Sequence, residues 1–259
     1  MLWLCQGHSM QAIQLVSVDL FDTLVDVSTG RHALWQTFFG QAYTPARAEQ
    51  AWALSIQVFL TSLDQLNTTL TYQSLHAMLQ ACYTEVFAYL RVGFDPGEAA
   101  QVVTLQHAQS PWFPDALPCL EWVRRRYRLC LASDTDEAMV GEQVRQYPFD
   151  MLFTSERLQV YKGDAQNRFF GAMVRHYALT PGQMLHVGDS PAEIAAAQSL
   201  GLQTCWVNRS GRSWPHARPP TYEVASLDAL VALLGAAASV GHSVVGMEGS
   251  AVVPTRNCA

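Results

Sequence analysis

Two carboxylates stand three residues apart in the segment VSVDLFDTLVD, which covers residues 16–26. Asp19 closes an apolar run, Asp22 follows it, and Phe21 lies between the two. An aspartate at the end of a buried strand could act as a nucleophile, exchange a proton or bind a cation. Because a phenyl ring can do none of these, the chemistry of this segment depends on residues elsewhere in the sequence.

Further polar residues follow the other apolar runs that have the pattern of strands. They are Ser133 and Asp134 after RLCLA, Asp189 and Ser190 after MLHVG, and Lys162 in the loop after MLFTS. A single aspartate in such a place is most often a helix N-cap, and a single lysine there is usually solvated. Ligands of parallel α/β sheets bind at the carboxyl ends of the strands, so we expect these residues to meet at one edge.

As a set, these residues could support phosphoryl chemistry. Two aspartates could hold Mg²⁺ together with a substrate phosphate and water. With a cation drawing charge from the phosphoryl oxygens, Asp19 could attack phosphorus and form a covalent intermediate. Lys162 would neutralise the bound anion, and the Ser133 hydroxyl would hold a phosphoryl oxygen.

The elements that position these residues follow two different hydrophobic patterns along the chain. Residues 11–18 have the pattern of a buried strand, and apolar residues then recur at helical spacing over residues 27–109. From about residue 110, single helices alternate with short apolar strands, which predicts a parallel sheet with right-handed crossovers. The predicted helices of this second part are 116–127, 136–146, 164–179, 191–201 and 226–234.

The predicted fold class is therefore α/β, a doubly wound parallel sheet with a Rossmann-like core and an inserted all-helical domain. We expect residues 10–26 and 110–234 to form the core and residues 27–109 to form a helical cap. Residues 1–9 and 235–259 are predicted to be flexible extensions, because neither shows a sustained periodicity.

The composition limits the classes of function. The chain of 259 residues is 49% hydrophobic and 15% charged, with a net charge of −6, which favours a well-packed soluble protein without a nucleic-acid or membrane surface. Six scattered cysteines without a CxxC pair fit a reducing, cytoplasmic compartment. The expected partner is a small-molecule substrate, and a homodimer is left open.

The ordered motifs resemble the haloacid dehalogenase (HAD) superfamily of aspartate-nucleophile hydrolases over residues 12–234. The resemblance rests on four motifs in the expected order: DLFDTL from Asp19, LASD with Ser133, YKGD with Lys162, and HVGDSPAE with Asp189 and Glu193. It implies the same α/β core, and it implies that the helical insertion closes over the site and selects the substrate.

Carried over by position, the resemblance makes Asp19 the nucleophile and a metal ligand. The backbone carbonyl of Phe21 and the carboxylate of Asp189 would complete the protein's share of an Mg²⁺ shell. Ser133 would bind the substrate's phosphoryl oxygens, and Lys162 would link the substrate, Asp19 and the acidic pair near Asp189.

Three further residues receive roles from the resemblance. Thr23 would fix the loop that carries the nucleophile. Glu193 would support the site, although the family often has an aspartate there. Arg31 lies where the family's cap begins, so we expect it to contact the substrate, with a solvated helix N-terminus as the alternative.

The sequence departs from the family's phosphatases at Phe21. These enzymes place a second aspartate there, which protonates the leaving alkoxide. Asp22 is no ready substitute, because adjacent residues of an extended segment face opposite ways. General acid–base assistance contributes ~10²–10⁴-fold to a rate, so its loss matters for poor leaving groups.

Three functions remain open from the sequence. The first, which we predict, is a Mg²⁺-dependent phosphohydrolase acting through an aspartyl-phosphate on a small phosphorylated metabolite. The second is a carbon–halogen hydrolase, since a halide needs no proton to leave and the family's dehalogenases have an aromatic residue at the position of Phe21. The motif that carries Asp189 has the form associated with Mg²⁺, which argues against this second function. The third is a catalytically weak protein that binds a ligand through the same fold.

Overall fold

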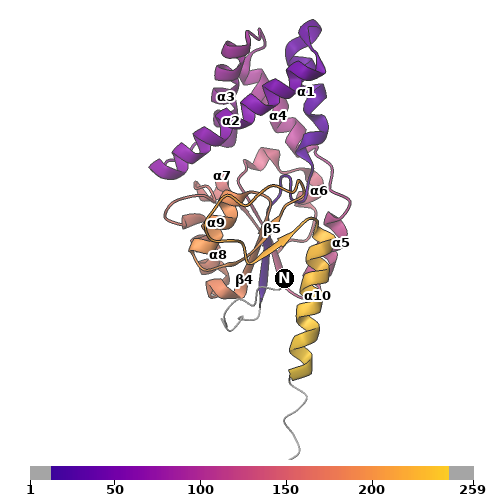
Figure 1. Cartoon of the computed structure of the whole chain (residues 1–259). Coiled ribbons are helices and arrows are strands. Elements are labelled where there is room, and N and C mark those ends of the chain that lie inside the picture. Colours follow the sequence, from indigo (N-terminus) through magenta and orange to yellow (C-terminus); the bar gives the residue numbers. More distant parts are fainter. Residues whose placement is uncertain (1–12, 245–259) are drawn as a thin grey trace, which may run out of the picture.

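The computed structural model describes residues 13–244. Six parallel strands form one sheet in the order β3-β2-β1-β4-β5-β6, with helices on both faces (Figure 1). The strands are β1 Leu15–Val18, β2 Arg128–Ser133, β3 Met151–Thr154, β4 Met184–Gly188, β5 Gln203–Val207 and β6 Tyr222–Val224. The predicted doubly wound α/β fold is confirmed.

The register of the sheet brings the predicted residues to one edge. Val18 of the central strand β1 pairs with Leu131 of β2 and with Val187 of β4. Because the strands are parallel, the residues that follow these three all emerge at the same side of the sheet. Asp19 is therefore a neighbour of the chain ends of β2 and β4, although it is far from both in sequence.

The core helices differ from the prediction in places. They are α5 Ala116–Arg124, α6 Glu142–Arg145, α7 Ser155–Leu158, α8 Arg168–Tyr177, α9 Pro191–Ser199 and α10 Leu227–Val244. The single helix predicted over 136–146 is wrong. A short 3₁₀ turn, Glu137–Met139, is separated from α6 by extended backbone at Val140 and Gly141. A Cβ on Gly141 would collide with the backbone oxygen of Ala108, so this close crossing requires the chain to break its helix there.

Two more differences concern the end of the chain. Strand β6 was not predicted, because only three residues, Tyr222–Val224, pair with β5. Helix α10 runs to Val244, ten residues beyond its predicted end, because the alanines after Gly235 favour a helix and each of the two glycines in this part costs only ~1 kcal/mol. The extension predicted for residues 235–259 therefore begins as helix, and residues 1–12 and 245–259 lie outside the described residues.

Four helices form a group beyond the carboxyl edge of the sheet (Figure 1). They are α1 Arg31–Phe39, α2 Pro45–Thr69, α3 Leu75–Leu90 and α4 Pro96–Ala108. A cluster of aromatic rings holds α1 and α3 together, with the Trp35 and Phe38 ring centroids 5.4 Å apart and those of Phe38 and Phe87 5.3 Å apart. The helical cap is confirmed, whereas its exact bounds at residues 27 and 109 stay a prediction.

A buried carboxylate joins the cap to the core. Asp136, in the loop after β2, accepts hydrogen bonds from the backbone N–H of Leu75 at 2.8 Å and of His76 at 2.7 Å. These N–H groups open α3 and have no partner within the helix, so a negative charge there is favourable. Tyr161 adds a second link, since its hydroxyl donates to the Gln73 carbonyl at 2.7 Å. Both links place cap side chains against the carboxyl edge of the sheet.

No helix within residues 13–244 is both long enough and apolar enough to cross a membrane.

Removing the carboxylate of Asp136 tests this attachment. We expect Asp136→Ala to lower the free energy of unfolding by ~1–2 kcal/mol, because two N–H groups at the start of α3 lose their acceptor. We also expect faster proteolysis at residues 70–74. The control is Asp95→Ala, which removes the N-cap of α4 inside the cap, where Asp95 Oδ1 accepts from Glu98 N at 2.8 Å. Equal proteolysis of the two variants at residues 70–74 would contradict the role of Asp136.

Candidate active site

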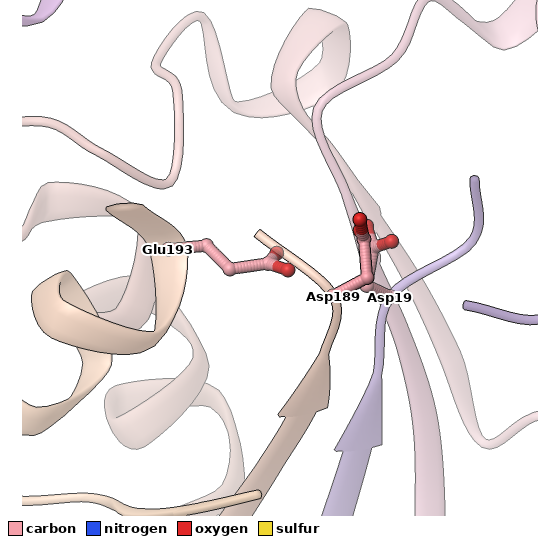
Figure 2. A group of neighbouring side chains, drawn as sticks. All are labelled: Asp19, Asp189 and Glu193. Atoms are coloured by element: carbon pink, nitrogen blue, oxygen red, sulfur yellow. The ribbon is translucent and has the colours of Figure 1, made fainter. Parts of the chain in front are cut away.

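Three carboxylates converge beyond the ends of β1 and β4. Asp19 follows β1, Asp189 follows β4, and Glu193 reaches toward both from the first turn of α9 (Figure 2). One oxygen of each carboxylate lies within 4.8 Å of one oxygen of the other two. Such a group repels itself strongly when it is buried, so it requires a compensating positive charge.

Lys162 supplies that charge. Its side chain is only 4% exposed, and its Nζ donates to Asp19 Oδ1 at 2.5 Å, to the Ala132 carbonyl at 3.2 Å and to the Glu193 carboxylate. The backbone N–H of Lys162 donates to Asp134 Oδ1 at 2.8 Å, which fixes the loop that carries the lysine. The structure thus brings together the predicted nucleophile, the lysine and the acidic pair.

Glu193 is held from three sides. The Ser190 N–H donates to Glu193 Oε1 at 3.1 Å, as expected for a capping box at the start of α9. His186 Nε2 lies 3.3 Å from Glu193 Oε2, and His186 Nδ1 lies 3.0 Å from Ser17 Oγ. Sequence reasoning treated His186 as structural and missed this link. The sequence held a sign of this contact, because Ser17 and His186 are polar residues within two apolar strands, and the two pair with one another in the sheet.

The surroundings of the three carboxylates shift their pKa values in different directions. Burial raises the pKa of Asp19 to about 7, because the lowering by the Lys162 ammonium is offset in part by the Glu193 carboxylate. Burial also acts to raise the pKa of Glu193, but Lys162 and His186 outweigh it and lower this pKa to about 2. Burial, Glu193 and Asp19 raise the pKa of Asp189 well above its usual range. Glu193 is thus held as an anion, whereas the pKa of Asp189 lies well above that of an ordinary carboxyl group.

The loop after Asp19 is a tight, strained turn. Asp22 has a left-handed backbone with φ = 57°, and its N–H donates to the Val25 carbonyl at 2.8 Å. Arg209 secures the loop, since its Nη2 donates to the Thr23 carbonyl at 2.9 Å while the guanidinium binds Asp115 through two 2.9 Å bonds. Sequence reasoning did not find Arg209. The expected fixing role of Thr23 therefore involves its carbonyl, whereas its buried hydroxyl has no hydrogen-bond partner among residues 13–244.

Phe21 faces the cap. Its ring lies 4.8 Å from the ring of His107 on α4, edge to face, and it borders an apolar cavity of about 270 Å³ between cap and core. Asp22 borders the same cavity, and it also borders a second cavity of about 360 Å³ that Arg209 and Arg212 line. The strained turn, which is not extended, explains why Asp22 does not point away from Phe21 as the sequence suggested.

Two other predicted residues have clear surroundings. The Ser133 hydroxyl is buried and has no hydrogen-bond partner in the described part of the chain, so it is available to a ligand. Arg31 is a surface residue of α1 that pairs with Glu49 at 3.2 Å, and it is not among the residues that border the cavity at Phe21. Its contact with a substrate stays a prediction.

The three carboxylates have the chemistry of a divalent-cation site, since hard cations prefer oxygen ligands. Lys162 already occupies one oxygen of Asp19 and one of Glu193, and Arg212 Nη2 lies 3.5 Å from Asp189 Oδ2. A cation would therefore compete with these two side chains, and Asp19 and Asp189 are the residues that would hold it.

Comparisons with known proteins agree on one family. A family model described as haloacid dehalogenase-like hydrolase matches residues 13–201. The (S)-2-haloacid dehalogenase of Pseudomonas sp. (strain YL) is 26% identical over 245 residues, covering 88% of this chain and 97% of that protein. Haloacetate dehalogenase H-2 of Moraxella sp. (strain B) is 21% identical over 237 residues, covering 87% of this chain and 99% of that protein.

A solved structure shows the same fold. It is the L-2-haloacid dehalogenase from Xanthobacter autotrophicus with chloropropionic acid covalently bound. Its TM-score is 0.71 at 18% sequence identity, with 86% of this chain and 98% of that chain covered.

These comparisons contradict the predicted phosphohydrolase. Both curated relatives are dehalogenases, and both align with this chain over nearly their whole length. The similar solved structure is that of a dehalogenase as well. The prediction gave too much weight to Asp189 as a sign of Mg²⁺ and too little to Phe21. A phenyl ring cannot protonate a leaving alkoxide, and a halide leaves as a stable anion without a proton.

A substitution at Gly188 tests how tightly Glu193 is held. A Cβ at this last residue of β4 would collide with the Glu193 carboxylate, which is fixed by Lys162. We expect Gly188→Ala to lower the free energy of unfolding by ~1–3 kcal/mol in urea denaturation. The matched control is Gly171→Ala on α8, where a Cβ would lie 3.4 Å from Arg175 Nη1, at the end of a flexible side chain. Equal stability of both variants would contradict the tight packing at Gly188.

Stability should depend on pH through His107. Burial lowers the pKa of His107, and its Nδ1–H donates to the Val103 carbonyl at 2.9 Å. Below the unfolded pKa of ~6.5 the unfolded chain binds a proton that the folded chain refuses, so stability falls as pH drops from 7 toward 5. We expect a shallower dependence in His107→Leu, measured by urea denaturation at several pH values. Identical slopes for variant and wild type would show that His107 does not contribute.

Proposed function

Because this chain belongs to the haloacid dehalogenase-like hydrolase family, we propose that it hydrolyses the carbon–halogen bond of 2-halo carboxylic acids with Asp19 as the nucleophile. The observation that carries the proposal is Phe21. It stands two residues after Asp19, at the position where the phosphatases of the family have the aspartate that protonates a leaving alkoxide, and an apolar ring cannot donate that proton. The activities of the two curated relatives support the same reaction.

In the first step, an Asp19 carboxylate oxygen attacks the carbon that bears the halogen. A C–O bond forms, the C–X bond breaks, and the halide leaves with the bonding electron pair, so the product is an ester of Asp19. Lys162 holds Asp19 Oδ1 at 2.5 Å and so orients the carboxylate. In this proposal the hydroxyl of Ser133, which has no hydrogen-bond partner among the described residues, donates to the carboxylate of the substrate.

In the second step, water attacks the carboxyl carbon of the Asp19 ester. Asp189 is the group suited to take the proton from this water, because its carboxylate is close to that of Asp19 and burial raises its pKa. The C–O bond to the substrate carbon is retained, and the bond to the Asp19 carbonyl carbon breaks. The products are a 2-hydroxy acid, a halide ion and a proton, which balance one substrate and one water.

Asp19 and Asp189 could also hold Mg²⁺, which would supply charge compensation to the acidic cluster. The proposed reaction does not need that compensation, because Lys162 supplies positive charge and the halide leaves as an anion. A cation on Asp19 would draw electron density from the attacking oxygen. We therefore propose that the reaction proceeds without a metal ion.

The nucleophile can be tested directly. We expect wild-type chain to release bromide from 2-bromopropanoate at the same rate with and without a chelator. Asp19→Asn should reduce this rate by at least ~10³-fold, because no other carboxylate can form the ester. The control is Asp150→Asn, a surface residue just before β3, at the opposite edge of the sheet, paired with Arg128 at 3.5 Å. No bromide release by folded wild type, or equal release by Asp19→Asn, would contradict the proposal.

Isotope labelling separates the ester mechanism from direct attack by water. In H₂¹⁸O with enzyme in excess over substrate, the hydroxy acid of a single turnover should carry ¹⁶O, because its oxygen comes from Asp19. The label should then appear in Asp19 itself, which mass spectrometry of the peptide detects. Immediate appearance of ¹⁸O in the product would show that water attacks the substrate carbon.

A further inference from the structure

The cavity at Phe21 is lined by one continuous stripe of α2. The stripe repeats at three- and four-residue spacing, which puts its members on one face of the helix. Its members are Trp52, Ser55, Ile56, Phe59, Leu60 and Leu63. In Figure 1 the second half of α2 extends over the carboxyl edge of the sheet. The stripe lines the same cavity as Phe21, which follows Asp19 by two residues.

This stripe is only partly covered by the protein. Ile56 is 42% exposed and Leu60 is 53% exposed, although both border the cavity. Apolar surface that stays exposed to water costs a free energy of ~25 cal/mol for each Å². A ligand that covers these side chains therefore gains affinity. We call these two exposed residues the mouth of the cavity, and Phe21, in the loop after Asp19, borders the same cavity.

The charge of the lining selects against a small polar substrate. Among the described residues that border this cavity there is no Lys or Arg, whereas Asp22 and Asp134 do border it. Burial lowers the pKa of His107, so this residue stays neutral there. A carboxylate would be repelled from the cavity, while an uncharged hydrocarbon group would be accepted.

The size of the cavity sets the size of that group. Its volume is about 270 Å³, and an apolar cavity of ~150 Å³ is large enough to hold benzene. Haloacetate or a 2-halopropanoate would leave most of this space empty. A chain of several methylenes or a phenyl ring would fill it.

Resting on the proposed function, we infer that the substrate is a 2-halo carboxylic acid that carries a bulky apolar substituent, an alkyl chain of about four carbons or a phenyl group. The apolar group occupies the cavity between α2 and Phe21, and the carboxylate stays outside it, near Ser133.

Turnover and binding test this inference separately. Full-length wild-type chain is assayed for bromide release from bromoacetate, 2-bromopropanoate, 2-bromohexanoate and 2-bromo-2-phenylacetate. Each buried methylene should raise kcat/KM by roughly fourfold until the cavity is filled. A kcat/KM that is flat or falls with chain length, with bromoacetate turned over, overturns the inference and leaves the proposed function standing.

Calorimetry with the unreactive acids propanoate and hexanoate does not depend on turnover. We expect hexanoate to bind about sixtyfold more tightly, from roughly fourfold for each of three methylenes. This result without any bromide release would support the cavity's selectivity and refute the proposed chemistry. Equal or undetectable binding of both acids would overturn the inference whatever the turnover assay shows.

Blocking the mouth provides a variant with a matched control. Ile56→Trp should lower the ratio of kcat/KM for 2-bromohexanoate over bromoacetate by at least tenfold, because the larger ring enters the cavity. Leu117→Trp on α5, where Leu117 is 41% exposed, adds the same ring at a matched exposure without touching the cavity and should leave the ratio unchanged. Should Ile56→Trp fail to fold, Leu60→Trp serves the same purpose.

A second copy of the chain is the competing occupant of the stripe. Light scattering of wild type and Ile56→Trp distinguishes it from a substrate. A wild-type dimer that becomes a monomer in Ile56→Trp, with the substrate ratio unchanged, would assign Ile56 and Leu60 to a subunit interface and overturn the inference. A mass that is the same in both proteins, together with the altered ratio, supports the substrate pocket.

Discussion

The contact of the Lys162 ammonium with two buried carboxylates is the interaction on which the site depends. Three carboxylates cannot share so small a buried volume without a positive charge, because the loss of hydration costs each ion several kcal/mol. The lysine also ties together three distant parts of the chain, since Asp19 follows β1, Ala132 lies in β2 and Glu193 belongs to α9. The same contact that permits the charges to be buried therefore sets the orientation of the nucleophile.

The second constraint is the attachment of the cap to the core. Asp136 fixes the start of α3, and Tyr161 binds the carbonyl of Gln73 two residues before it, so core residues hold this part of the cap. Phe21 borders the apolar cavity, whereas Asp19, two residues earlier in the chain, belongs to the charged cluster. This division suits a reaction in which the leaving group needs no proton, because the apolar side can select the substrate without supplying an acid.

Much of the site was predictable because its residues sit in ordered motifs at strand ends. Asp19, Ser133 and Asp189 lie where parallel strands end, and parallel pairing brings such ends together whatever their separation in sequence. Lys162 and Glu193 lie in the segments that follow β3 and β4. The phosphohydrolase prediction failed because the residue types of this edge serve two reactions, and Asp189 was given more weight than Phe21. The contact of His186 was missed because Ser17 and His186 were not recognised as register partners, and that of Arg209 was missed because its hydrogen bond reaches Thr23, far away in the sequence.

The sequence by itself determined the α/β order of elements, the helical insertion after the first strand and the residues that meet at the catalytic edge. Hydrophobic periodicity and short motifs are local properties of the sequence, so they can be recognised without a structure. Only the tertiary structure decided the break of the helix at Gly141, the hydrogen-bonded support behind Glu193 and the half-exposed stripe of α2 above Phe21. Each of these features depends on how closely two separate segments of the chain approach one another. The spacing of residues along either segment does not determine that distance.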